Sequence, residues 1–338
     1  MVALSDVVAH NNCLRQRPSG LIALFVGATS GIGLSTLRTL AERLPGSRLY
    51  VVGRSKERFA SELSRLERLN DCTEIIFIEA EIALLKNTNK IVKFLSNRES
   101  KLDLLYMSPG SSKANFLEED TDEGLDICMS LSYYTRIHLV QGLIALLLSS
   151  PNPRVLSVLA GGHEKYLFTT DGDLGLRNPG NYDAIRAVDQ LTTLHSLAFA
   201  HLASLNPKIS FLHVHPGWVA TGFLSNLLGS GGMTGRLLEI VVSPLYRLIA
   251  ITVEESGARQ AFHATSAMYP SRELIRTAQF DVNSCAVCHT MHSGFYLVGP
   301  NGDTASANSF LAQLLDDGWA NKVWKYTENV FQGVLVKD

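Results

Sequence analysis

A glycine-rich turn near the amino terminus has the residue types and spacing that hold a phosphate-bearing ligand. An apolar run at 21–26 leads into Gly27-Ala28-Thr29-Ser30-Gly31-Ile32-Gly33, and a helix-like stretch follows. Glycines allow a close backbone approach to a pyrophosphate, and free N–H groups at a helix N-terminus attract its charge. We therefore predict a dinucleotide site rather than an ordinary glycine-rich connection. The residues expected to contact the dinucleotide here are Gly27, Thr29, Ser30, Gly31, Ile32 and Gly33.

The end of the second apolar run, 49–52, indicates which dinucleotide is bound. An NAD site usually places a carboxylate here, which accepts a hydrogen bond from the ribose 2′-hydroxyl. Arg54 and Ser55 instead offer a guanidinium and a hydroxyl, which suit a 2′-phosphate. We therefore predict NADP(H) as the cofactor. The alternative is that Arg54 is a solvated surface charge.

Both motifs belong to a regular alternation of short apolar runs and helical segments. Strands are predicted at 21–26, 49–52, 74–78, 102–107, 154–159, 209–214 and 294–298, and helices at 35–44, 56–69, 86–95, 125–148 and 182–205. Such an alternation favours parallel βαβ units with right-handed crossovers. The predicted fold is α/β, a doubly wound parallel sheet of the Rossmann type.

Composition and the absence of a linker predict a single domain. The chain has 338 residues with 46% hydrophobic and 18% charged residues, and its formal net charge is −2. This is typical of a globular chain with a large core, and no basic cluster indicates nucleic acid. We predict one domain, 1–338, with its core at about 20–222 and 290–300. A helical lid insertion is expected at about 222–280.

Two apolar stretches bear on membranes and location. Residues 139–148 are too few to cross a bilayer, which needs about 20, and predict a buried helix. Residues 237–253 are interrupted by charges and a proline and predict an amphipathic lid, with contact to a membrane surface as the alternative. No secretory signal is evident in 1–20. We expect a cytoplasmic protein without an integral membrane segment; a homo-oligomer is left open.

Cysteine and histidine patterns indicate no metal site. The five cysteines are scattered, unlike a disulfide framework. Cys285-Ala286-Val287-Cys288-His289 has the spacing of a c-type haem attachment site, but such a site needs an export route. His213 and His215 share one face of a strand, where packing and hydrogen bonding near the cofactor edge is preferred over metal binding. We expect neither metal nor haem.

Residues 20–222, which include the glycine turn, resemble the short-chain dehydrogenase/reductase superfamily, most closely its divergent members from fungal secondary-metabolism clusters. The further motifs that carry the resemblance are Glu79-Ala80-Glu81, Ser108-Pro109-Gly110, Ser157-Val158-Leu159-Ala160, Asn181-Tyr182 and Pro216-Gly217-Trp218-Val219-Ala220-Thr221. The resemblance implies a seven-stranded sheet that binds the dinucleotide at its carboxyl edge. It places Glu81 at the adenine amino group and Val219 and Thr221 at the nicotinamide carboxamide, with Gly110 and Pro216 also among the cofactor contacts. The alternative for Pro216-Gly217 is a simple turn.

The resemblance also implies hydride transfer, for which this family uses a tyrosine, a lysine four residues on, a serine and an asparagine. Tyrosine has a pKa of about 10, so it needs a nearby cation to act as a base at neutral pH. Tyr182 falls on the tyrosine position and Arg186 on the lysine position. Arginine keeps the charge but does not release a proton. The serine position falls on Ala160, and the asparagine position near Ser130.

The predicted catalytic residues are therefore Tyr182, Arg186, Ser130 and Ser157, the last lying just before the serine position. For Tyr182 the alternative is a core tyrosine at the start of a helix. His163, Glu164 and Lys165 follow the fifth strand and could supply replacement acid–base groups, although a solvated loop is preferred.

The first functional hypothesis is an NADP(H)-dependent oxidoreductase that acts on a carbonyl or alcohol of an apolar small molecule, as a tailoring step in secondary-metabolite biosynthesis. The alternative is a non-redox tailoring enzyme, a cyclase, isomerase or dehydratase, because the usual serine and lysine are replaced. A third option is a binding or regulatory subunit without catalysis.

Overall fold

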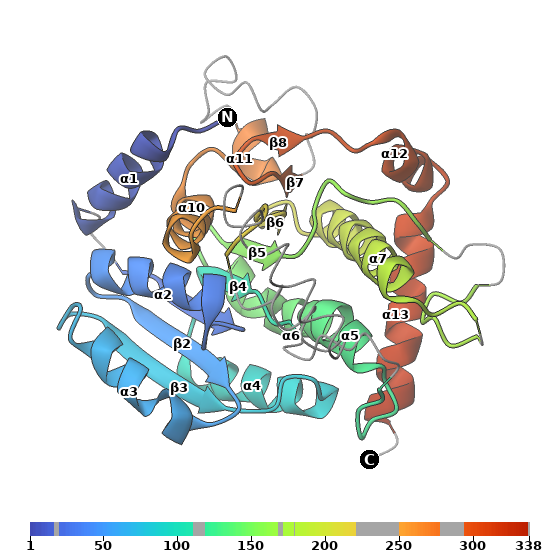
Figure 1. Cartoon of the computed structure of the whole chain (residues 1–338), viewed down its shortest axis with the longest axis horizontal. Helices are drawn as coiled ribbons and strands as arrows, with labels where there is room; N and C mark the ends of the chain where they lie inside the picture. Colours follow the sequence, from blue (N-terminus) through green and yellow to red (C-terminus); the bar gives the residue numbers. More distant parts are fainter. Residues whose placement is uncertain are drawn as a thin grey trace, which may run out of the picture.

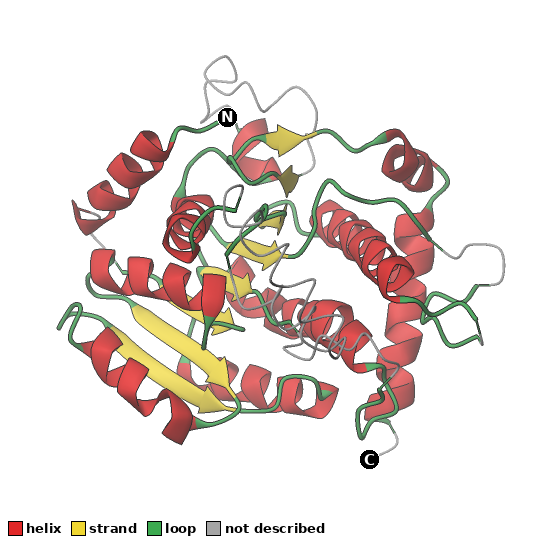
Figure 2. Ribbon diagram, viewed as in Figure 1, coloured by secondary structure: helices red, strands yellow, loops and turns green. Residues whose placement is uncertain are grey.

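A twisted central sheet organises the molecule (Figures 1 and 2). The computed structural model describes residues 1–16, 20–110, 119–167, 172–178, 180–220, 250–277 and 294–336. The strand order is β3-β2-β1-β4-β5-β6-β7-β8. Their bounds are β1 (Ile22–Val26), β2 (Arg48–Gly53), β3 (Glu74–Glu79), β4 (Leu104–Met107), β5 (Arg154–Val158), β6 (Ser210–Val214), β7 (Phe295–Val298) and β8 (Thr304–Ala305).

The first seven strands are parallel, and β8 pairs antiparallel with β7. The strand order reverses between β1 and β4, and ligands of such sheets bind outside the carboxyl ends of the strands at this point. The predicted doubly wound Rossmann-type sheet is confirmed. The resemblance implied seven strands, whereas the described residues form eight, because a two-residue strand is added at the edge.

Two layers of helices cover the sheet, which explains why its central strands are almost wholly apolar. On one face lie α1 (Leu4–Cys13), α2 (Gly31–Arg43), α3 (Lys56–Glu67) and α10 (Val253–Thr265). On the other lie α4 (Leu85–Arg98), α6 (Thr135–Leu148), α7 (Ala184–Leu205) and α13 (Trp319–Leu335). Shorter helices are α5 (Ile127–Met129), α11 (Arg272–Arg276) and α12 (Ser309–Asp316).

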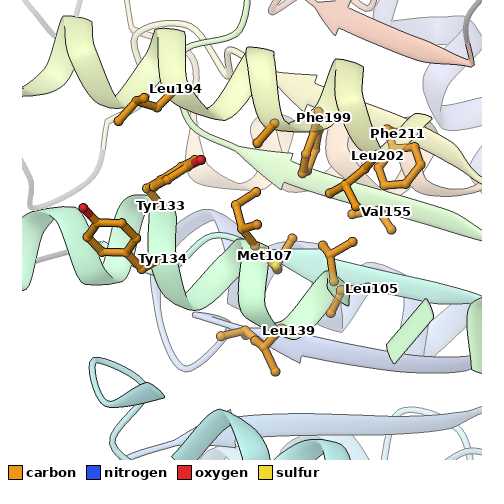
Figure 3. Close-up of a cluster of buried hydrophobic side chains, with 14 of the residues drawn as sticks. Leu105, Met107, Tyr133, Tyr134, Leu139, Val155, Leu194, Phe199, Leu202 and Phe211 are labelled. Atoms are coloured by element: carbon orange, nitrogen blue, oxygen red, sulfur yellow. The ribbon is translucent and has the colours of Figure 1, made fainter. Parts of the chain in front are cut away.

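The larger hydrophobic core lies between the sheet, α6 and α7 (Figure 3). Leu105 and Met107 of β4 and Val155 of β5 face Leu139 of α6 and Phe199 of α7, and all five are fully buried. A second core on the opposite face joins α2, α3 and α10 to the sheet. The two cores hold the carboxyl edge in place from both sides.

The predicted helix 125–148 is interrupted where it passes the carboxyl edge. After α5 the chain forms a π-helical turn, η2 (Ser130–Tyr134), before α6 begins. The Ser130 hydroxyl donates to the Ala83 carbonyl (2.5 Å), and that of Thr135 donates to Ile82 (2.8 Å). A side-chain hydroxyl that bonds to a group outside its own helix interrupts the regular hydrogen-bond pattern of an α-helix, and a π-helical turn does so too. The sequence pattern showed the apolar run but not this interruption.

One helical run, Ile127–Leu148, has the length and apolarity of a membrane span, but 67% of its most apolar window is buried inside the protein. It is a core helix, as predicted for 139–148.

The predicted lid insertion is only partly visible. Its described portion, α10, packs along α2 in the layer that covers the sheet. Gly257 permits this contact, because a Cβ there would lie 2.2 Å from the Ser35 Oγ. Residues 222–249 and 278–280 of the predicted insertion, and most of the amphipathic stretch 237–253, lie outside the described residues.

Candidate active site

The glycine turn forms a close backbone contact between β1 and the loop after β4. Gly27 has a φ of +81°, and a Cβ on it would lie 2.3 Å from the Pro109 nitrogen. Gly31, which begins α2, has a φ of +55°. Both positions require glycine, because a side chain is strained at positive φ. The turn therefore presents bare backbone at the start of α2, as a pyrophosphate requires.

Gly33 brings the first turn of α2 onto the preceding loop. A Cβ on Gly33 would lie 2.4 Å from the Gly27 carbonyl oxygen and 2.6 Å from the Ser108 Oγ. Ser108 donates to the same carbonyl of Gly27 (3.1 Å). Thr29 and Ser30 are exposed beside this turn, and Ile32 is half-buried. The cradle fits a dinucleotide phosphate. Ser108, to which the sequence analysis gave no role beyond its place in a motif, is a positioning residue of this cradle.

A pocket lies at the carboxyl ends of β2 and β3, next to the glycine turn. Its lining includes Arg54, Glu81 and Lys90, together with the apolar side chains of Ile91 and Phe94. Arg54 and Lys90 are exposed cations from different segments, one after β2 and one on α4. The structure thus brings the predicted Arg54 and Glu81 to one pocket and adds Lys90, which its sequence position gave no reason to choose.

Two carboxylates and a hydroxyl are fixed by backbone N–H groups at this end. Ser55 caps α3, and its Oγ accepts from the Arg58 N–H (3.2 Å). Glu79 accepts from the Lys56 N–H (2.8 Å), and Glu81 accepts from the Ala83 N–H (3.2 Å). The pocket therefore offers both carboxylates for polar N–H or O–H groups and cations for a phosphate.

Ser130 and Ser157 lie in the interior, both fully buried. The Ser130 hydroxyl donates to the Ala83 carbonyl (2.5 Å). The Ser157 hydroxyl accepts from the Arg136 Nη1 (2.7 Å). Both predicted hydroxyls therefore make hydrogen bonds within the protein.

Arg136 of α6 is a fully buried cation at the carboxyl edge. Besides Ser157, its guanidinium donates to the carbonyls of Leu131 (3.1 Å), Val158 (2.8 Å) and Pro109. Burial lowers the pKa of Arg136 to about 9. The side chain ties η2 to the ends of β4 and β5, and the sequence analysis did not identify it.

Tyr182 lies directly before α7, half-buried and packed against the larger core. Asp183 accepts from the Arg186 N–H (3.0 Å), and its carboxylate also lies 3.0 Å from the Arg186 Nε. Both side chains of this ion pair are about half exposed. Asn181, just before Tyr182, donates to Asp173 (2.9 Å). The segment before α7 is thus held by polar contacts on either side of Tyr182.

The remaining predicted cofactor residues lie along the same edge. Gly110 is exposed, Pro216 is half-buried and Val219 is buried. Val219 forms a bridge with Ile251. Thr221 lies outside the described residues, as do Cys285, Cys288 and His289, which the sequence analysis considered for haem attachment.

A buried polar network lies behind the loops that follow β5 and β6. The Ser196 hydroxyl lies 2.6 Å from Glu164 Oε1 and 2.7 Å from His213 Nδ1, and all three side chains are buried. The Ala160 N–H donates to His213 Nε2 (3.4 Å). Burial, and then the charge of Arg136, lower the pKa of His213 to about 3. Neutral His213 thus has the packing and hydrogen-bonding role expected of it.

Nearer the surface, the rings of His163 and His215 contact each other, with centroids 4.3 Å apart. His163 is exposed and His215 is half-buried. Burial, and then the charge of His163, lower the pKa of His215 to about 4. Across the part of the chain that the structure describes, no three His, Cys, Asp or Glu side chains are grouped to hold a metal.

The strand order and the glycine turn between β1 and α2 define a Rossmann-type α/β protein. The family model for short chain dehydrogenase matches residues 21–167. Oxidoreductase AN1596 of Emericella nidulans is 35% identical over 334 residues, which cover 98% of each chain. Oxidoreductase lepF of Aspergillus flavus is 32% identical and covers 100% of this chain and 99% of its own. The chain belongs to the short-chain dehydrogenase/reductase family, groups with its divergent fungal members and is an oxidoreductase.

Solved structures show the same fold. The structure of L-sorbose reductase from Gluconobacter frateurii, complexed with NADPH and L-sorbose, matches with a TM-score of 0.55 at 17% identity. The match covers 73% of this chain and 90% of that one.

Proposed function

We propose that the protein is an NADP(H)-dependent oxidoreductase that transfers hydride between nicotinamide and a carbonyl or alcohol of an apolar small molecule. The observation that carries the proposal is the pairing of two sites along one sheet edge. The glycine turn provides bare backbone for a pyrophosphate, and the adjoining pocket provides Arg54 and Lys90 for a 2′-phosphate. The cytoplasmic location expected from the sequence is part of this proposal.

The part of the cofactor from the pyrophosphate to the adenine would be held by the loops that follow β1, β2 and β3. The start of α2 at Ser30 to Gly33, with Gly27 and Thr29, would hold the pyrophosphate. Arg54 and Ser55 would meet the ribose end, and Glu81 the adenine. Beyond the pyrophosphate, the remaining proposed contacts are Gly110, Pro216, Val219 and Thr221. When bound, NADPH supplies the hydride; the protein's own groups supply binding, orientation and a proton.

Tyr182 is the proposed proton donor, because among the predicted catalytic residues its phenolic hydroxyl is the one suited to donate a proton to a developing alkoxide. Arg186 is proposed as its neighbouring cation, although the Asp183 carboxylate now shares that charge. Ser130 and Ser157 are proposed to support the site from the protein interior, because both hydroxyls are buried and make hydrogen bonds to neighbouring segments.

A role in tailoring a secondary metabolite is also proposed. It is supported by the fungal relatives, which include oxidoreductase andH of Emericella variicolor at 32% identity over 99% of this chain. An apolar substrate suits the residues that the sequence places in the segment 222–249.

Calorimetry with NADPH and NADH tests the cofactor assignment directly. We expect binding of NADPH at micromolar concentrations and at least tenfold weaker binding of NADH. Oxidation of NADPH with a panel of apolar ketones then tests the reaction. Absence of binding to either dinucleotide would remove the proposal, and equal affinity would remove its NADP(H) part. Product formation without nicotinamide would instead favour non-redox chemistry.

A further inference from the structure

A buried carboxylate organises the loop that leads into α7. Asp173 is 8% exposed, and its Oδ1 accepts from the Arg177 N–H (2.7 Å). Its Oδ2 accepts from the Asn178 N–H (2.9 Å) and from the side-chain amide of Asn181 (2.9 Å). Asn181 directly precedes Tyr182 in the chain. The loop is therefore folded around one acid, and that acid holds the residue next to the proposed proton donor.

The same loop is bonded to the helix that follows Tyr182. Gln190 of α7 is fully buried, and its Nε2 donates to the carbonyls of Asp173 (3.2 Å) and Leu174 (3.0 Å). Tyr182 stands two residues before α7 begins. Contacts thus run from α7 to the loop through Gln190, and from the loop to Asn181 through Asp173. We call Asp173, Asn181 and Gln190 the tyrosine clamp.

Other elements hold the outer part of the loop. A Cβ on Gly175 would lie 2.7 Å from the Tyr326 hydroxyl, so the loop lies directly against α13. The Arg177 Nη1 donates to Asp120 Oδ1 (2.7 Å), which joins the loop to the segment before α5. Leu174 is buried in the larger core. Because these anchors are independent of the tyrosine clamp, loss of one clamp bond should loosen the end that carries the tyrosine without releasing the whole loop.

The backbone of the loop is strained at Leu176. Its φ is +56°, and across the part of the chain that the structure describes no other non-glycine residue has a positive φ. The side chain is buried in the larger core, and its N–H donates to the Asp173 carbonyl (3.1 Å). A bulky residue rarely adopts this conformation, and such strain persists only where the surroundings fix it, often beside functional sites. The conformation of this loop is therefore imposed by its contacts.

We propose that Asp173 is a positioning residue that acts through Asn181 to place Tyr182 for proton transfer; the proposal rests on the oxidoreductase function above. The phenolic hydroxyl must lie within hydrogen-bond distance of the substrate oxygen that takes its proton. A displacement of about 1 Å can slow such a step about a hundredfold. The bond from Asn181 to Asp173 fixes the backbone directly before the tyrosine, and α7 fixes the backbone after it.

Comparison of kcat with cofactor affinity separates positioning from a general loss of structure. With NADPH and a ketone turned over by the wild type, we expect Asp173→Asn and Asn181→Ala each to lower kcat about tenfold or more. The Kd of NADPH, measured by calorimetry, should change less than about twofold, because neither side chain belongs to the glycine turn or its pocket. The double variant should lose little more activity than Asp173→Asn alone, since both changes remove one shared bond.

Asp103 offers a matched control, because it is a buried carboxylate of the same kind at the opposite, amino edge of the sheet. It is 6% exposed and accepts from the Ile22 N–H (2.9 Å), the Ser150 hydroxyl (2.5 Å) and the Lys101 ammonium (3.0 Å). Asp103→Asn should lower the free energy of unfolding but keep the wild-type kcat. An equal loss of kcat in Asp103→Asn, or a wild-type kcat in Asp173→Asn or Asn181→Ala, would overturn the proposal.

Hydrogen exchange tests the tyrosine clamp without turnover. In the ligand-free protein, peptides that span 177–183 should exchange at least about tenfold faster in Asp173→Asn than in the wild type, and at the wild-type rate in Asp103→Asn. Equal exchange in Asp173→Asn and the wild type would overturn the clamp. Failure of the wild type to bind any dinucleotide would remove the oxidoreductase function and the catalytic role of the clamp together. Loss of activity in Tyr182→Phe with full activity in Asp173→Asn would remove the positioning role alone.

Discussion

The guanidinium of Arg136 donates to the Ser157 hydroxyl at 2.7 Å, in a place where neither side chain reaches solvent. The other bonds of Arg136 go to backbone carbonyls of three separate segments, at Pro109, Leu131 and Val158. All four acceptors are uncharged. The ends of β4, η2 and β5 are therefore joined by one cation, and the candidate site is built around it.

Replacing Arg136 should destabilise the fold. Arg136→Met keeps much of the volume but leaves buried carbonyls without donors, and each such group costs about 1–3 kcal/mol. We expect the free energy of unfolding in urea to fall by about 2–4 kcal/mol. The control is Arg65→Gln, whose side chain is 66% exposed and should change stability by less than about 0.5 kcal/mol. Equal stability of the two variants would contradict the assigned role.

A side chain at Gly33 should block dinucleotide binding. In Gly33→Ala the new Cβ would lie 2.4 Å from the Gly27 carbonyl oxygen, so α2 must move away from the turn that holds the pyrophosphate. We expect NADPH affinity, measured by calorimetry, to fall at least about tenfold, or about 1.4 kcal/mol. Gly333→Ala is the matched control, since a Cβ there meets nothing within 4 Å. Unchanged affinity in Gly33→Ala would place the pyrophosphate elsewhere.

Arg54 and Lys90 should set the preference for NADPH over NADH. Both cations line one pocket, and a charge-assisted hydrogen bond contributes about 1.5–3 kcal/mol. Arg54→Gln should therefore weaken NADPH binding roughly tenfold or more and leave NADH binding nearly unchanged. Lys90→Gln should act in the same direction with a smaller effect, since Lys90 is a flexible point charge. Equal losses for both dinucleotides would show that neither cation reads the 2′-phosphate.

Acid should destabilise the protein in a defined pH window. Burial lowers the pKa of His213 and His263 to about 3, and that of His138 to about 4. Unfolded histidine has a pKa of about 6.5. Below that value the unfolded state binds more protons, so stability falls as pH drops, by up to about 1.4 kcal/mol per pH unit for each group. The loss should end below the folded pKa values.

Urea unfolding at pH 7.5, 6.0 and 5.0 measures this dependence. His263→Gln should reduce the slope by about one histidine, because the folded pKa of His263 is lowered to about 3. A free energy of unfolding that stays constant between pH 7.5 and 5.0 would show that these histidines are accessible to protons in the folded state.

Sequence patterns predicted the features that depend on local spacing. The strands from β1 to β7 lie within one or two residues of the predicted runs, because a buried parallel strand must be continuously apolar. The glycine turn was also predictable from local sequence, because the positive φ of Gly27 and Gly31 calls for glycine at those two positions. Arg54 and Glu81 could be placed because they directly follow strands.

Features that arise where distant segments meet were not predictable. Arg136 looks like an ordinary charge in an apolar helix, and only the folded chain brings Pro109 and Val158 to it. Lys90 has a helix-surface position in the sequence and reaches the pocket of Arg54 through the packing of α4. The interruption at η2 depends on two hydroxyls that bond to a loop some fifty residues earlier in the chain.

The helix α13, also unpredicted, packs along α7 and contacts α4. Tyr133 bonds to Thr327 and Tyr134 to Tyr326, each at 2.6 Å, and the ring of His138 contacts Phe331. The chain thus uses its own final helix to shield the outer side of this layer (Figure 1). A second copy could dock against α7 there only by displacing α13, so self-association, if it occurs, is directed to a different surface.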